Sequence, residues 1–473
     1  MNWRKVIHWF WIPALLAGCS VGPNYHPPKP AISGGWSELT PGLTTNSPVP
    51  LTQWWKTFGD AELNALIERA VLTNYDLKAA EARLRGARAL RGAVLADFLP
   101  TIGAGASYTT ARRSQNASTT PMQLLNSDTY QAGFDASWEI DVFGGKRRSL
   151  QAATADMQAV EEDVHGVEIS LLAEVARNYV DYRGTQRRLV SARQNLKAQQ
   201  ETVDITQLRS DKGLASELEV AQARTLLAST KSQIPVLETA LKLSSHRLSV
   251  LLGQEPGALE LELAGDVPIP GTPPEVPVGL PADLLRRRPD VRRSERQLAG
   301  ANARIGVLTA ELFPKFYLIG AAGYQSLEAD TLIEPASKFW SAGPSARWRL
   351  LEYPRLKALI NAQTAQQEQL LAQFNQTVLL ALEDVENALV AYAKERERCQ
   401  TLREGVVSSR RSVALSNELY LKGVGDFLNV LLDQRTLFQA EDALIQSERA
   451  VTENLVALYK ALGGGWETTE LAN

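Results

Sequence analysis

Hydrophobic residues recur every seven positions along two neighbouring segments of the chain. The first runs from about residue 144 to 212 and contains no proline. A strict seven-residue period predicts helices that supercoil around a partner. At 1.5 Å per residue, a continuous helix of this length would reach about 100 Å. The next stretch, 214–251, predicts a return helix. The heptad positions are Leu189, Leu196 and Val203, followed by Leu227, Ile234, Leu241 and Leu248.

The second half of the chain repeats this pattern after 210 residues. A repeat of this length indicates a duplicated half-protein, because solenoid periods are only tens of residues. A second long helix over 354–422 and a second return helix over 426–461 are therefore expected. We assign the first repeat to 60–253 and the second to 281–463, with a linker over 254–280. Matching positions include Trp138 and Trp348, Tyr182 and Tyr392, Gly213 and Gly423, and Gly253 and Gly463.

Each half also contains two segments in which apolar and polar residues alternate, which predicts strands with one apolar face. The hairpins should cover 101–140 and 316–350, and the apolar face of the last strand should run from Trp340 to Leu350. Strands of about ten residues with aromatic residues near their ends are typical of outer-membrane barrels. The expected strands are 101–108, 129–140, 316–325 and 339–350, and the aromatic residues are Tyr108, Tyr130, Trp138, Tyr324, Trp340 and Trp348.

Four strands cannot close a membrane barrel, for which about eight is the minimum. Every backbone polar group in the hydrocarbon layer needs a partner within the protein. The strands should therefore be shared among chains, and three chains would supply twelve. The alternative is that the strands pack on the surface of a soluble domain.

The N-terminus predicts export and attachment to a membrane. Residues 6–17 are apolar but too short to span a bilayer, which indicates a signal peptide over 1–18. The segment ends Leu-Ala-Gly-Cys at Cys19 and resembles a bacterial lipobox. This resemblance implies an N-palmitoyl and S-diacylglycerol lipid on Cys19, and Ser20 after it favours the outer membrane. Residues 19–59 would form a lipid-anchored segment; the alternative is an ordinary signal peptide with an incidental cysteine.

Composition and motifs argue against several other classes of protein. The net charge of −3 provides no basic field for nucleic acid. The four histidines show no metal-ligand spacing, and no nucleotide-binding or hydrolase motif occurs, so neither a metal site nor an enzyme is indicated. Cys399 is expected to be a small buried apolar residue. The arginines of 286–293 are expected to form an ion-paired helix start, with an anion site as the alternative. Residues 464–473 form a C-terminal tail.

Short motifs follow one another along the chain in a fixed order. They are Cys19–Tyr25 (CSVGPNY), Trp54-Trp55, Ser137–Gly144 (SWEIDVFG), Asp283–Val291 (DLLRRRPDV) and Gly423–Leu431 (GVGDFLNVL). Because these motifs occur in this order within the two repeats, the chain resembles the outer membrane efflux protein family of TolC-like outer membrane factors. The resemblance is to the NodT- and OprM-like lipoprotein branch of that family. The resemblance covers nearly the whole chain after the signal peptide.

The resemblance implies a fold class that is mostly α with a transmembrane β-barrel portion. It would be a homotrimeric channel in the outer membrane lipid, to which each chain gives four strands and long coiled-coil-like helices. The expected function is the passive exit duct of a tripartite efflux system for small molecules such as drugs. Its partners would be a periplasmic adaptor (a membrane fusion protein) and an inner-membrane transporter of the RND type. No cofactor is implied beyond the lipid.

Two other functions remain open at this point. One is the outer-membrane duct of a type I protein secretion system, against which the lipidation argues. The other is a trimeric coiled-coil surface protein, against which the amphipathic hairpins argue.

The resemblance also places the resting closure of the tunnel in the turns at its periplasmic tip. Leu428 matches the constricting leucine, where a ring of three would close the tunnel by packing and dewetting. The acidic residue expected four positions later is Leu432 here, and Asp433 follows it. One position turns a helical side chain by about 100°, so either Asp433 or Leu432 lines the constriction.

Asp426 is expected to be the N-cap of the second return helix. The second tip, which differs from the first in its sequence, is expected to be the mobile one. The tip-turn residues, which would also dock the adaptor, are Lys212, Gly213, Leu214, Lys422, Gly423 and Gly425.

Overall fold

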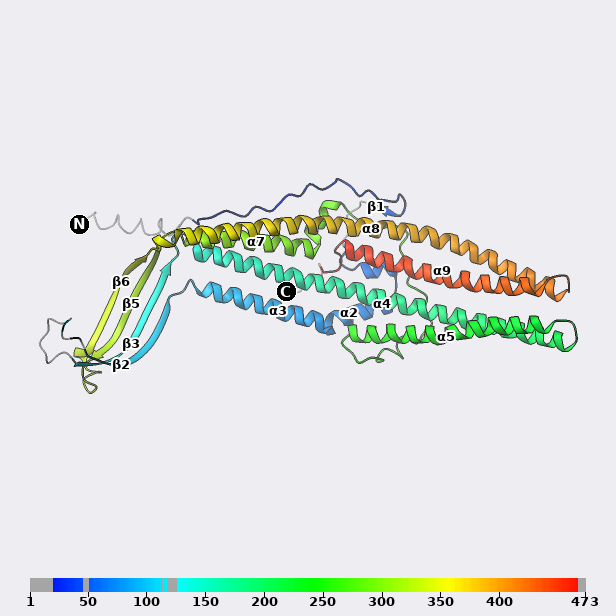
Figure 1. Ribbon diagram of the computed structural model, residues 1–473, viewed down its shortest axis with the longest axis horizontal. Helices are drawn as coiled ribbons and strands as arrows, with labels where there is room; N and C mark the ends of the chain where they lie inside the picture. Colours follow the sequence, from blue (N-terminus) through cyan, green and yellow to red (C-terminus); the bar gives the residue numbers. More distant parts are fainter. Residues whose placement is uncertain (1–19, 46–50, 113, 115, 117–125, 467–473) are drawn as a thin grey trace. The chain divides into compact units, whose positions relative to one another are not determined.

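The computed structural model describes residues 20–45, 51–112, 114, 116 and 126–466 (Figure 1). The predicted signal peptide, Cys19 and most of the C-terminal tail lie outside the described residues. Contacts divide the chain into two units, each treated by itself. The sheet unit comprises Met1–Lys29, Leu84–Val160 and Arg293–Phe374, and the helical unit comprises Pro30–Arg83, Glu161–Arg292 and Asn375–Asn473.

The sheet unit contains one four-stranded antiparallel sheet in the order β2-β3-β5-β6 (Figure 1). Both predicted hairpins are present, and β3 pairs with β5 to join them. The first hairpin is longer than expected at its turn end. The strands are β2 (Thr101–Arg112), β3 (Asn126–Ile140), β5 (Lys315–Ser326) and β6 (Lys338–Arg347).

The expected end of the last strand at Leu350 is wrong. Strand β6 stops at Arg347, and a short 3-10 helix, η7 (Leu350–Glu352), follows. The indole nitrogen of Trp348 donates a hydrogen bond to the carbonyl oxygen of Leu312 at 3.0 Å. Trp348 and Leu350 therefore do not continue the apolar face of the strand.

The strand register places most of the large apolar side chains of the sheet on one face. Residues directly opposite one another share a face. One such row is Ala104, Phe134, Ala322 and Trp340, and another along the same face is Trp138, Leu318 and Pro344. On the other face, two neighbouring rows consist of small or polar residues apart from Phe339: Gly105, Gly133, Gly323 and Phe339, then Gly103, Asp135, Ala321 and Ser341.

Two tryptophans tie the sheet to the loops that precede it. The Trp138 indole donates to the carbonyl oxygen of Phe98 at 2.8 Å, as Trp348 does to Leu312. These loops follow helices α3 (Tyr75–Ala96) and α7 (Pro289–Ala310). Each matched tryptophan thus fixes the turn from a helix into a strand.

Two long helices and two return helices dominate the remaining structure: α4 (Gly145–Asp211), α5 (Glu217–Leu251), α8 (Tyr353–Leu421) and α9 (Phe427–Ala461). Helices α5 and α9 begin and end 210 residues apart. Helix α5 starts three residues later than expected, because Ser216 caps it in a reciprocal pair with Glu219. Asp426 is the N-cap of α9, as expected. Within the described residues, each helix is too short or too polar to span a bilayer.

The core of the helical unit uses the predicted heptad positions. Leu189 and Ala192 of α4 pack on Leu237 of α5, with Ile234 and Leu241 beside them. The ring of Trp54 stacks on Tyr459 of α9 at 5.2 Å.

Shorter elements complete this unit. They are η2 (Trp54–Phe58), α2 (Ala61–Thr73), η5 (Pro281–Asp283), α6 (Leu284–Arg287) and the paired strands β1 (Thr44–Thr45) and β4 (Val276–Pro277). The turn η6 (Pro335–Ser337) belongs to the sheet unit.

Candidate functional site

The two helix tips are built alike. Gly213 and Gly423 follow α4 and α8 with φ angles of 71° and 75°, the left-handed conformation that glycine adopts at a helix C-terminus. The next amides turn back to the helix: Leu214 donates to Arg209 at 2.8 Å, and Val424 donates to Leu419 at 3.1 Å. All of the expected tip-turn residues lie in these turns or at their ends.

The second tip carries a tighter turn than the first. A Cβ atom on Gly425 would lie 2.9 Å from the Cβ of Leu419, so this position excludes a larger residue without a shift of the backbone. The matched residue of the first tip is Ala215. The sequence difference between the tips therefore has a structural counterpart.

A side-chain link joins the two tips. The Tyr420 hydroxyl donates a hydrogen bond to Glu219 Oε2 at 3.1 Å, and its ring contacts Phe427 at 5.0 Å between centroids. The guanidinium of Arg209 lies over the same ring at 4.5 Å. Burial, and then the hydrogen bond to Glu219, raise the pKa of Tyr420 above its usual value. The core around it contains Val203, Ala223, Phe427, Val430 and Leu431.

The candidate gate residues occupy different faces of α9. Leu428 is 47% exposed and Leu432 is 40% exposed. They are four positions apart and therefore lie on the same side of the helix. Asp433 is half-buried and is turned away from this side. Asp426 accepts the amide of Leu428 at 3.0 Å, which fixes the start of the helix.

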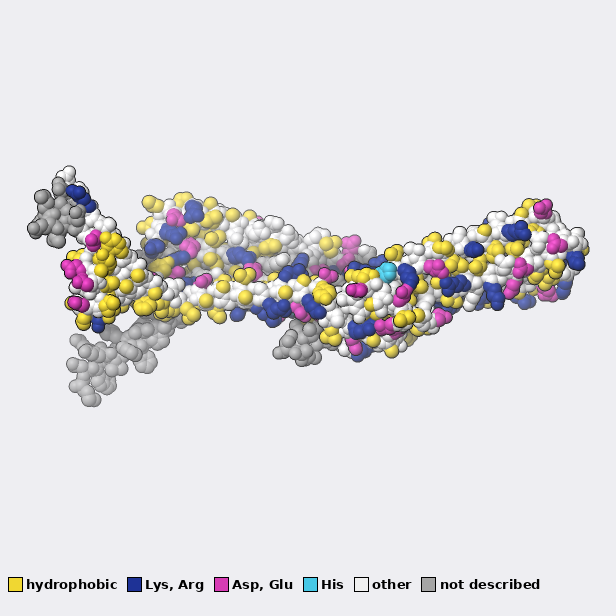
Figure 2. Space-filling view, turned by 90° about the horizontal axis from the view of Figure 1, so that it is seen from below, with side chains coloured by type: hydrophobic (Ala, Val, Ile, Leu, Met, Phe, Trp, Pro, Cys, Tyr) yellow, Lys and Arg dark blue, Asp and Glu magenta, His cyan; other side chains and the backbone are white. Residues whose placement is uncertain are grey.

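Both helix tips expose large apolar side chains. Contiguous exposed apolar residues mark sites of association. Figure 2 shows charged and hydrophobic side chains interspersed along the helix pairs. The exposed apolar residues at the tips are Leu214, Leu218, Leu421, Val424, Leu428 and Leu432.

The aromatic residues of the sheet lie largely where the sequence predicts. Tyr108 and Tyr130 are directly paired, with ring centroids 4.8 Å apart. Trp340 is 80% exposed on the apolar face, and Trp138 lies on the same face. Tyr324 pairs with Ala132 on this face. Only Trp348 falls outside the strands.

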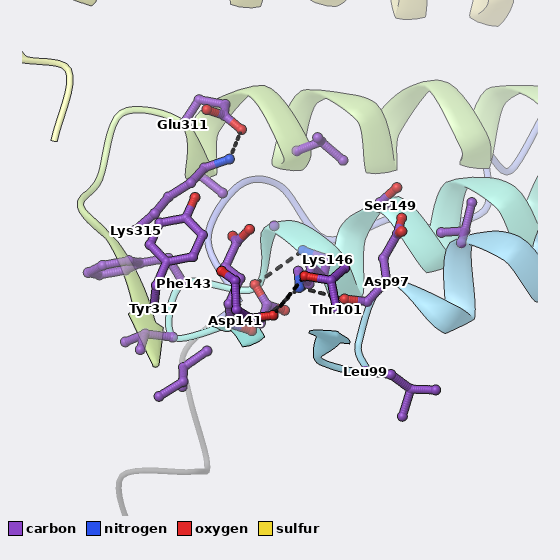
Figure 3. Close-up of a pocket in the computed structure, with 18 of the residues that line it drawn as sticks. Asp97, Leu99, Thr101, Asp141, Phe143, Lys146, Ser149, Glu311, Lys315 and Tyr317 are labelled. Carbon is purple, nitrogen blue, oxygen red and sulfur yellow. Dashed lines mark hydrogen bonds and ion pairs between the residues drawn. The ribbon is translucent and has the colours of Figure 1, made fainter. Parts of the chain in front are cut away.

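A cavity of about 630 Å³ opens where the helices of the sheet unit meet the strands (Figure 3). Several of its charged side chains have structural partners. The ammonium of Lys146 donates to the carbonyl oxygen of Asp97 at 2.5 Å, and Lys315 pairs with Glu311 at 2.5 Å. Asp141 accepts the amides of Lys146 at 3.1 Å and Arg147 at 3.0 Å, at the start of α4. These contacts connect the start of α4 and the start of β5 to the adjoining loops.

Comparison with known proteins decides the family. Residues 66–254 and 280–464 match the family described as outer membrane efflux protein. The chain belongs to the outer membrane efflux protein family. Pyoverdine export outer membrane protein OpmQ of Pseudomonas aeruginosa is 34% identical over 460 residues, covering 96% of this chain and 95% of that protein.

Solved structures agree with this assignment. The outer-membrane channel OprN has a TM-score of 0.90 and 36% identity, covering 95% of this chain and all of that chain. The open state of the Neisseria gonorrhoeae MtrE outer membrane channel has a TM-score of 0.83 and 26% identity, covering 95% and 99%. This efflux protein is therefore an exit duct of the outer membrane.

Other predicted features of the efflux protein can now be placed. Cys399 is buried in α8, and burial raises the pKa of its thiol. Arg288 pairs with Asp290 at 2.7 Å and Asp384 at 2.9 Å, and Arg292 pairs with Glu162 at 2.7 Å. The ion-paired helix start is thus favoured over an anion site.

Sequence reasoning missed Tyr420 and Arg183. Both differ from their matched residues in the repeat, which are Ser210 and Ala393. The Arg183 side chain is fully buried and pairs with Glu62. At both positions the two copies of the repeat contain different kinds of side chain. That difference was the available signal.

Proposed function

We propose that three copies of the chain form the duct, with a twelve-stranded barrel in the outer membrane. The observation that carries the proposal is the sheet register. It places apolar residues in consecutive rows on one face, as a lipid-facing surface requires.

The edges of the sheet support closure between chains. Strands β2 and β6 each have one neighbour within the described chain. Open edges in lipid leave backbone groups without partners, which costs several kcal/mol per group. Pairing β6 of one copy with β2 of the next removes both edges. Three copies give a barrel wider than the eight-stranded minimum, with room for a lumen.

The gate is assigned to the tip of α8 and α9. Leu428 and Leu432 share an exposed side of α9, so we place both on the constriction and leave Asp433 beside it. The Tyr420–Glu219 link would hold this tip against the first one at rest. Opening then requires the link to break and the second tip, with its Gly423 and Gly425 turn, to move.

The exposed turns are the proposed docking points for the periplasmic adaptor. Lys212, Gly213, Lys422 and Gly423 are exposed, and Leu214 is 68% exposed. The adaptor would connect the duct to an inner-membrane transporter, for which the RND type is our choice. Small molecules such as drugs are the proposed cargo, with most of the selectivity in the transporter.

Lipidation of Cys19 is the proposed anchor. The residues after it are held firmly: the amide of Val21 donates to Phe143 at 3.1 Å, and Arg148 donates to the carbonyl oxygen of Val21 at 3.1 Å. These contacts would keep the lipid near the end of β3, at the edge of the membrane.

Electrophoresis of the unheated lipoprotein and conductance in planar bilayers test the proposal together. We expect a trimer that conducts. A trimer without conductance would support the coiled-coil surface protein instead. Export assays then separate efflux from type I secretion. They compare cells that lack the duct with cells in which it is restored, using drugs in one assay and a secreted protein in the other.

A further inference from the structure

One carboxylate on the polar face of the sheet has no balancing charge near it. Asp135 lies in β3, opposite Gly103 of β2 and Ala321 of β5. It is exposed, and the structure gives its carboxylate no hydrogen-bond or ion-pair partner among the described residues. The rows on either side contain no charged side chain. They are Gly105, Gly133, Gly323 and Phe339, and Thr101, Ser137, Ile319 and Gly343.

The surroundings of Asp135 leave its carboxylate open to solvent. A Cβ atom on Gly103 would lie 2.8 Å from Asp135 Oδ1, so the carboxylate lies over a residue without a side chain. Ser341 ends the same row on β6. Small neighbours neither neutralise the charge nor bury it.

The other charges of this face are of both signs and lie together at its helix end. Glu139 occupies the row next to Lys315 and Arg347. The ammonium of Lys315 is directed at Glu311 of the preceding loop, at 2.5 Å (Figure 3). Positive and negative groups are therefore mixed there, and Asp135 is the unbalanced charge of the face.

We propose that Asp135 selects for charge in the lumen of the duct, favouring cationic over anionic molecules. This rests on the proposed trimeric barrel, in which the polar face lines the lumen and Asp135 becomes a ring of three carboxylates. Rings of acidic side chains favour cations in pores. The ring lies in the sheet unit, whereas the gate residues belong to the helical unit.

The effect depends on salt in a predictable way. Charges act over a Debye length of about 10 Å at 0.1 M salt and about 30 Å at 0.01 M. In a wide lumen the carboxylates therefore influence passing ions mainly at low ionic strength. A preference that appears only at low salt is the expected signature.

The experiment measures the K⁺/Cl⁻ permeability ratio of the full lipidated trimer from reversal potentials in planar bilayers. Asp135→Asn should lower the ratio by about twofold or more at low salt, and Asp135→Glu should retain it. Asp128→Asn is the matched control, because Asp128 is on the same strand but on the opposite face, where it accepts the Tyr108 hydroxyl. The pair is repeated with Leu428→Ser, so that a closed tip does not dominate the resistance.

An unchanged ratio for Asp135→Asn in both backgrounds would overturn the assignment, as would an equal loss in Asp128→Asn. Thiol labelling separates this failure from failure of the barrel. Asp135→Cys should react with a charged, membrane-impermeant thiol reagent in lipid vesicles, whereas Phe134→Cys on the apolar face should not. The reverse labelling would refute the barrel orientation itself; the expected labelling with an unchanged ratio would refute only the role of Asp135.

Discussion

The hydroxyl of Tyr420, at the end of α8, donates a hydrogen bond of 3.1 Å to the carboxylate of Glu219, near the start of α5. These residues are far apart in the sequence and belong to different copies of the repeat. Glu219 also completes the capping pair with Ser216. Each tip can therefore keep its own turn when this contact breaks.

Replacing Tyr420 by Phe should raise the resting conductance of the duct. The change keeps the ring among its neighbours and removes one hydrogen bond to a charged group, which contributes about 1.5–3 kcal/mol. If that bond favours the closed tip, the ratio of open to closed tips should rise by about tenfold to a hundredfold. Planar-bilayer recordings measure it. Tyr353→Phe, at an exposed position of α8, is the control and should leave the conductance unchanged.

The same link should make the closed state sensitive to alkaline pH. The folded pKa of Tyr420 is raised above the unfolded value of about 10. Its contribution is therefore fully present below about pH 10 and is lost as the pH rises through the higher folded pKa. Conductance of the unmodified duct should be constant near neutral pH and rise only in this alkaline range. A rise of the same size in Tyr420→Phe would show that another group titrates.

Leu428→Ser should open the constriction, because it replaces an apolar side chain on the exposed side of α9 with a small polar one. Resting conductance and antibiotic uptake should both increase. The matched control is Leu218→Ser, at the corresponding position of α5, where the side chain is 65% exposed. A smaller effect in the control is expected if the second tip is the gate. Equal effects would mean that both tips form it.

Arg183→Ala should destabilise the fold without affecting the gate directly. The buried guanidinium donates to the carbonyl oxygens of Leu263 at 3.0 Å and Gly265 at 2.7 Å and pairs with Glu62. Removing one partner of a buried ion pair costs about 3–5 kcal/mol. Arg69→Ala, which breaks the more exposed pair with Glu262, should cost about 0–1 kcal/mol. Thermal unfolding followed by circular dichroism compares them; similar shifts would contradict the structural role of Arg183.

The sequence predicted the helices well because their signals are local. Each signal determines the structure of residues close to it in the sequence. These signals are the heptad spacing, the glycines at 213 and 423 and the N-cap at Asp426. The end of β6 was missed for the opposite reason. Trp348 and Leu350 continue the alternating pattern, but Arg347 already pairs with Lys315, the first residue of β5, so the residues after Arg347 have no residue of β5 opposite them.

The candidate site could be predicted only in part. Leu428 was assigned by resemblance, and nothing in its local pattern distinguishes it from Leu218. The Tyr420–Glu219 link depends on the packing of two distant helix pairs, which no local period encodes. The difference between the repeats did mark Tyr420, since its counterpart is Ser210. Comparing the copies position by position is therefore more informative for this fold than either copy alone.

Gly22→Ala should release the segment that follows the lipid anchor. Gly22 has a φ angle of 86°, and a Cβ atom there would lie 2.5 Å from the Cα of Gly306 on α7. Because both the angle and the contact exclude a side chain, the segment should leave its position against α7 and lose the bonds that Arg148 donates to it. Limited proteolysis read by mass spectrometry should show faster cleavage near residues 20–25. Gly34→Ala is the control, since its Cβ would meet nothing within 4 Å; equal cleavage in both variants would mean that the contact with α7 does not hold the segment.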